Sequence, residues 1–151
     1  MGAEERVALV NLERLFPRLR DATYKITSPA QADYNCIAWA TGDDSRWWEP
    51  DPFGQYYWPE GVPREYTVEV YAEVFQRLGF EECQDATFEV GVEKVAIFAI
   101  DGSPTHAARQ LADGTWTSKL GQLEDIEHRG LDQVGEGDYG EPVLFLKRPR
   151  H

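Results

Sequence analysis

Long apolar runs are missing from this chain of 151 residues. Its opening segment, MGAEERVALVNLERLF, carries charges throughout, so we expect neither a signal peptide nor a membrane span. Cysteine is equally scarce, since Cys36 and Cys83 are the only two. Two cysteines without an export signal argue against a disulfide framework and predict a cytoplasmic protein with reduced thiols. Cys36 is then free for chemistry.

Basic residues are fewer than acidic residues. Fifteen Lys and Arg residues face 27 Asp and Glu residues, which gives a formal net charge of −12. Such a chain repels a phosphate backbone, so nucleic acid is not an expected partner. A solvated acidic surface is the default explanation of the charge, and attraction of a cationic substrate is the alternative. The cysteines and the three histidines include no closely spaced pair of zinc ligands, and we expect neither a metal nor another cofactor.

The spacing of apolar residues predicts a single domain over residues 1–151, with helices first and strands later. Helical spacing and nearby Pro or Gly residues predict helices at residues 4–16, within 34–40 and at 67–78. Apolar and β-branched content predicts strands at residues 94–100, 106–111, 115–120 and 142–147. The sequence therefore predicts an α+β fold in which N-terminal helices pack on an antiparallel sheet.

Residues 45–64, SRWWEPDPFGQYYWPEGVPR, contain too many prolines and glycines for a regular element. We call this segment the aromatic loop. Its rings would either stack on a substrate or hold the loop against the body of the domain. The candidate substrate-binding residues are Trp47, Trp48, Tyr57 and Trp58.

The candidate catalytic residues are Cys36 and His106. A thiol becomes a good nucleophile at the start of a helix and beside an imidazolium, and Cys36 begins the predicted short helix. Of the histidines, only His106 lies in a predicted strand, since His128 falls in a polar stretch and His151 is the last residue. The alternative interpretation is a small buried cysteine and an ordinary core histidine.

The motifs YNC at the helix start, KVAIFAI as a strand and THAARQLADGTWTS as a hairpin resemble the papain-like superfamily, in its compact NlpC-type branch of cysteine peptidases. The combination YNCIAWA, SRWW, THAARQL and WTSKLG resembles more closely an uncharacterised bacterial family of unknown function. The resemblance implies a papain-like fold. It also implies a cysteine hydrolase or acyltransferase that acts on an amide or thioester bond of a peptide, amide or protein substrate.

The resemblance further implies a polar residue, on the strand after the histidine, that orients the imidazole. If the turn at residues 113–114 includes a one-residue bulge, this position falls on Ser118, whereas a two-residue turn brings Lys119 there. Two carboxylates lie just beyond and are further candidates, Glu124 and Asp125.

Acyl transfer also needs donors for the developing oxyanion. The Cys36 backbone N–H would supply one, and the second would come from Asn35, Tyr34 or Gln31. The competing function is a catalytically inactive domain of the same fold that binds a peptide or protein through the aromatic loop.

Overall fold

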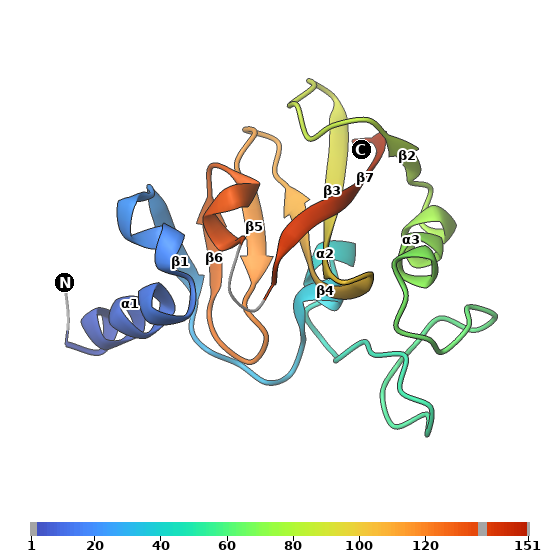
Figure 1. Cartoon of the computed structure of the whole chain (residues 1–151), viewed down its shortest axis with the longest axis horizontal. Coiled ribbons are helices and arrows are strands. Elements are labelled where there is room, and N and C mark those ends of the chain that lie inside the picture. The colour runs from blue at the N-terminus through green and yellow to red at the C-terminus, as the bar shows by residue number, and fades with distance from the viewer. Residues whose placement is uncertain (1–2, 136–138, 151) are drawn as a thin grey trace.

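The computed structural model describes residues 3–135 and 139–150, so His151 lies outside the described residues. Seven antiparallel strands form one sheet, in the order β1-β6-β5-β4-β3-β7-β2 (Figure 1). The strands are β1 (Tyr24–Ser28), β2 (Glu81–Cys83), β3 (Val92–Ile100), β4 (Ser103–Gln110), β5 (Trp116–Lys119), β6 (Asp125–His128) and β7 (Glu141–Pro149). The predicted strands at residues 94–100, 106–111 and 115–120 correspond to β3, β4 and β5, which are consecutive neighbours in the sheet, and the unpredicted β6 continues the same order.

Three α-helices and two short 3₁₀ helices accompany the sheet. They are α1 (Ala3–Leu15), η1 (Pro17–Asp21), α2 (Cys36–Thr41), α3 (Val68–Arg77) and η2 (Leu131–Val134). The sequence predicted all three α-helices. Asn35 caps α2, and Gly42 ends it with a φ of 96°, a value that favours glycine. Thr67 caps α3 through a hydrogen bond from the Val70 N–H.

The predicted papain-like fold, with N-terminal helices packed on the sheet, is wrong. The seven-stranded sheet dominates the structure, and α2 has only six residues. Figure 1 shows α1 beyond the β1 end of the sheet and α3 beside its β2 end. The resemblance rested on the order of a few elements, and that order gives no information about the edge strands β1 and β2 or about β6.

The turn between β4 and β5 sets the register of the central strands. Leu111 N–H bonds the Thr115 carbonyl at 2.7 Å, and Gly114 has a φ of 92°. These features describe a three-residue loop with a left-handed glycine. The ladder beyond it pairs Gln110 with Trp116 and ends at Arg109 and Thr117.

Extending this register by one residue places Ala108 opposite Ser118. The one-residue bulge predicted as one alternative is therefore confirmed, and the two-residue turn that would place Lys119 there is wrong. Hydrogen-bonded pairs alternate along an antiparallel ladder, so the next bonded position after Arg109 is Ala107. That position is where the ladder between β4 and β5 has opened.

Each face of the sheet carries its own core. Ile97 and Ala107 belong to a cluster with α2, α3 and part of the aromatic loop. Phe98 and Ala108 point to the other face and belong to a cluster with α1, η1 and η2. In the described part of the chain, no helix has the length and apolar character needed to cross a membrane.

Candidate functional site

Cys36 is the first residue of α2, and its side chain reaches the opening between β4 and β5. The Ala107 N–H, which would otherwise continue the ladder, donates a hydrogen bond to the Cys36 sulfur. Ala107 directly follows His106 in β4. The thiol therefore contacts the strand next to His106. Neighbouring side chains of a strand point to opposite faces, so Ala107 faces α2, whereas the His106 side chain lies against Phe98 on the other face. The pairing of Cys36 with His106 stays a prediction.

Burial raises the pKa of the Cys36 thiol. The hydrogen bond from Ala107 and the charge of Lys119 act in the opposite direction but do not outweigh burial. The resting form of Cys36 is therefore a neutral thiol. In the described residues no hydrogen bond joins this thiol to His106.

A buried relay of side chains crosses β4, β5 and β6. His106 Nε2 lies 3.0 Å from Ser118 Oγ, and Ser118 Oγ lies 2.8 Å from His128 Nε2. His128 Nδ1 in turn lies 2.9 Å from the Gly130 carbonyl oxygen. The side chains of the relay are at most 1% exposed. Ser118 therefore occupies the predicted orienting position, and it continues to a second histidine.

The Gly130 carbonyl fixes the direction of every hydrogen bond in the relay. A carbonyl oxygen only accepts, so His128 Nδ1 carries a proton and its Nε2 in the neutral ring is an acceptor. Ser118 must then donate to His128 and accept from His106 Nε2. This assignment leaves His106 Nδ1 unprotonated, with its lone pair available. Nδ1 is also buried and has no hydrogen-bond partner among the described residues.

Aromatic rings enclose the His106 imidazole. Tyr139 stacks on it with ring centroids 4.1 Å apart, and Phe98 contacts it edge-on at 5.2 Å. Burial, together with the nearby His128, lowers the pKa of His106 well below its ordinary value. The imidazole is thus neutral at pH 7. The resting site does not contain the imidazolium that would stabilise a Cys36 thiolate.

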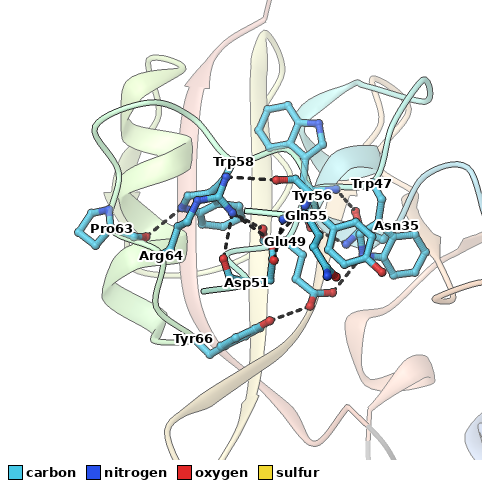
Figure 2. Close-up of polar contacts among 11 residues, drawn as sticks. Asn35, Trp47, Glu49, Asp51, Gln55, Tyr56, Trp58, Pro63, Arg64 and Tyr66 are labelled. Atoms are coloured by element: carbon cyan, nitrogen blue, oxygen red, sulfur yellow. Dashed lines mark hydrogen bonds and ion pairs between the residues drawn. The ribbon is translucent and has the colours of Figure 1, made fainter. Parts of the chain in front are cut away.

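Cys36 and Tyr139 also line a pocket of about 220 Å³. The pocket lies between the start of α2, the aromatic loop and the beginning of β4. Glu49 lies in its wall, where it accepts hydrogen bonds from Trp47 Nε1 at 3.1 Å and from the Tyr66 hydroxyl at 2.7 Å. Figure 2 shows Glu49 between these two side chains.

The predicted substrate-binding rings divide into two groups. Of the four, only Trp47 lines the pocket. Trp48 and Trp58 are 7% and 5% exposed and belong to the core, where Trp58 Nε1 bonds the Pro63 carbonyl at 2.9 Å. Tyr57 packs against Trp48, with ring centroids 4.7 Å apart. These three rings hold the aromatic loop against the domain.

The predicted oxyanion residues differ in position. The Asn35 side chain donates to the Trp48 carbonyl at 2.6 Å and accepts from the backbone N–H groups of Ala38 and Trp48. It therefore fastens the aromatic loop to α2, although it also borders the pocket. Gln31 is not among the pocket-lining residues, and its described contact is a carbonyl that accepts from Lys119.

The remaining candidates for orienting His106 have other partners. Lys119 Nζ donates to the carbonyls of Gln31, Gly121 and Leu123. Asp125 accepts from the Tyr34 hydroxyl at 2.5 Å and from the Thr27 hydroxyl. No described hydrogen bond joins Glu124 to the relay.

His128 is the functional candidate that the sequence interpretation missed. It lies in β6, whose sequence DIEH is short and largely polar. The available signal was alternation, because Ile126 and His128 both point into the second core while Glu127 is partly exposed. The register of β6 against β5 is what brings His128 to Ser118.

In residues 3–135 and 139–150, no three His, Cys, Asp or Glu side chains are arranged to hold a metal ion.

The motifs around Cys36 and His106 fall within residues 25–147, a range that matches a protein family. The match agrees with the expected membership of an uncharacterised family, but it supports neither the papain-like resemblance nor a bacterial origin. No curated protein and no solved structure matches the chain. Because the matched range covers most of its length, the chain belongs to the family described as a domain of unknown function, DUF7689.

Proposed function

We propose that the protein is a cysteine hydrolase or acyltransferase that acts on an amide or thioester bond, with Cys36 as nucleophile and His106 as general base. One observation carries the proposal. The direction of the relay leaves His106 Nδ1 as a buried, unprotonated nitrogen without a hydrogen-bond partner among the described residues, and the Cys36 thiol contacts the backbone of the next residue in β4, Ala107. Nucleophilic acyl transfer needs a thiol that opens to a pocket and a neutral base that can take its proton, and Cys36 lines a pocket while His106 lies on the strand that the thiol contacts.

The reaction begins from the neutral pair. As the sulfur attacks the carbonyl carbon, the Cys36 thiol proton passes to His106 Nδ1. The tetrahedral intermediate then breaks its bond to the leaving group, which takes the proton from Nδ1. Water, or another acceptor with an N–H, O–H or S–H group, attacks the acyl-Cys36 carbonyl and gives its proton to Nδ1, and Cys36 recovers that proton on departure.

The relay assists the protonated state of His106. When Nδ1 gains a proton, the Nε2–H still donates to Ser118, which in turn donates to His128. Hydrogen bonds to a charged donor are stronger than neutral ones, so the relay stabilises the transient imidazolium. Burial opposes this charge and keeps the resting ring neutral. The positioning residues are therefore Ser118 and His128.

Acylation of the protein by p-nitrophenyl acetate tests the proposal. We expect an acetyl adduct on Cys36, located by peptide mass spectrometry, and its loss in the Cys36→Ser variant. His106→Gln should slow acetylation of Cys36 by roughly a hundredfold, the contribution of a general base. Cys83 provides the internal reference, because its thiol is remote from the relay. Equal acetylation of both cysteines, unaffected by His106→Gln, would contradict the proposal.

A binding module is the second candidate, and the resting protonation states favour it. The raised pKa of Cys36 and the lowered pKa of His106 both oppose a thiolate–imidazolium pair, with burial as the main cause in each case. A domain that only binds would keep its affinity for a peptide or protein in Cys36→Ser and would show no selective acetylation.

A further inference from the structure

We infer that the pocket beside Cys36 takes a substrate with a cationic organic group, an ammonium or a guanidinium, and that Glu49 is the residue that recognises it. The identification of this group as part of a substrate rests on the proposed function. The cation site itself is tested below without turnover.

Glu49 is a half-buried carboxylate whose position is fixed from two sides. Trp47 Nε1 donates to its Oε1, and the Tyr66 hydroxyl donates to its Oε2 (Figure 2). A carboxylate offers about four acceptor positions, and these two bonds use only half of them. The remaining positions are available to a donor inside the pocket.

Glu49 has no positively charged partner within the described chain. The two arginines of the aromatic loop pair with other carboxylates, and Arg64 contacts Glu49 only at its backbone carbonyl, at 3.5 Å. Arg46 pairs with Asp43 at 3.1 Å and lies over the Tyr57 ring, while Arg64 pairs with Asp51 at 3.1 Å. A bound cation would therefore meet an uncompensated negative charge.

The other walls of the pocket suit a cation as well. Among the described residues that line it are four aromatic rings, those of Trp47, Tyr66, Tyr71 and Tyr139, and one charged side chain, that of Glu49. Aromatic faces attract cations, and burial against them strengthens the attraction. The pocket is smaller than a drug-sized site, so it fits a side-chain-sized group.

The arrangement places recognition and reaction in the same pocket. Cys36 and Glu49 both line it, so a cationic group on Glu49 would position an attached carbonyl toward the thiol. The net charge of −12 adds long-range attraction for the same class of substrate.

The test follows the Trp47 indole N–H by NMR during titration with three probes. They are Nα-acetyl-lysine amide, Nα-acetyl-arginine amide and the uncharged Nα-acetyl-norleucine amide. We expect at least one cationic probe to shift the Trp47 resonance to saturation, and the norleucine probe to bind at least tenfold more weakly. Equally tight binding of the norleucine probe would overturn the inference.

Three variants separate the charge from its surroundings. Glu49→Gln should weaken binding of the cationic probe roughly tenfold and leave the norleucine probe unchanged. Glu69→Gln, which removes an exposed carboxylate from the first turn of α3, should change neither. Tyr66→Phe keeps the charge and should retain the preference for cations. If Glu69→Gln reduces binding as much as Glu49→Gln, only the general negative field of the protein acts and the inference fails.

Repeating the titration on Cys36→Ser distinguishes this inference from the proposed function. Cation binding that persists in Cys36→Ser, together with no selective acetylation of Cys36 in the wild type, supports the inference and contradicts the proposed function. Selective acetylation of Cys36 in the wild type, without any preference for the cationic probes, would support the proposed function and contradict the inference.

Discussion

The relay and the aromatic loop are ordered in different ways. The relay residues His106, Ser118 and His128 belong to three neighbouring strands, so the sheet register sets their distances. The aromatic loop has one isolated bridge, between Trp48 and Tyr57, and is held mainly by side chains. The comparison teaches that the distances between the relay residues depend on strand register. The pocket wall that contains Trp47 and Glu49 depends instead on a few side-chain contacts of the aromatic loop.

The largest expected effect comes from breaking the relay at its centre. Ser118→Ala removes the partner of two buried imidazole nitrogens. Each orphaned group costs about 1–3 kcal/mol, so we expect the free energy of unfolding to fall by roughly 4 kcal/mol. We also expect acetylation of Cys36 to slow by about a hundredfold. Chemical denaturation and peptide mass spectrometry measure the two effects.

Ser103→Ala is the matched control, because Ser103 is an exposed serine at the start of β4. Its effect on stability should stay within about 0.5 kcal/mol. Similar results for the two variants would show that the relay contributes nothing to stability, and the contrast with the loop would disappear.

Acid should disrupt the relay before the loop. Burial lowers the pKa of His128 from 6.5 to about 4. Between these two pH values the unfolded chain binds a proton at His128 more readily than the folded protein does. The contribution of His128 to the free energy of unfolding is therefore fully present above pH 6.5 and is lost as the pH falls toward 4. We expect a loss of about 3 kcal/mol from His128, and His106 acts in the same direction.

The carboxylate of Asp43, which precedes the aromatic loop and binds its first residues, titrates at lower pH than His128. Burial of Asp43 is outweighed by hydrogen bonds from Ser45, Trp48 and Arg46, which lower its pKa from 3.8 to about 2. Its contribution to stability therefore persists until the pH falls below 3.8. Denaturation curves at pH 7 and pH 4.5, for the wild type and His128→Gln, measure the difference. A pH dependence that is identical in both proteins would contradict the assignment to the relay.

A smaller effect is expected where the loop joins α2. Asn35→Ala removes the cap of α2 and the two bonds to the Trp48 backbone. We expect the free energy of unfolding to fall by about 2 kcal/mol. The indole N–H resonance of Trp47 should also shift as the pocket wall loosens, and NMR measures this directly.

Phe53→Ala supplies the comparison within the loop. Phe53 is 84% exposed, so its truncation should change stability by less than about 0.5 kcal/mol. If Phe53→Ala destabilises the protein as much as Asn35→Ala, apolar contacts rather than polar anchors hold the loop.

Predictability from sequence followed the strength of the local signal. α3 was predictable because apolar spacing, the Thr67 cap and Gly79 all agree. β2 has three residues and a mostly polar sequence, so no local pattern marks it, whereas the four residues of β6 offer only the short alternation of Ile126, Glu127 and His128. The aromatic loop was correctly predicted as irregular, yet which of its rings face the pocket depends on long-range packing.

For the site, the sequence by itself determined the start of α2 at Cys36 and the strand position of His106, and it limited the position opposite Ala108 to Ser118 or Lys119. Each of these depends on caps, turns and alternation over a few residues. Only the tertiary structure decided that His128 completes the relay, that Ala107 bonds the thiol and that Glu49 faces the pocket. These contacts join residues far apart in the chain, and their formation depends on strand register and packing, which no local pattern encodes.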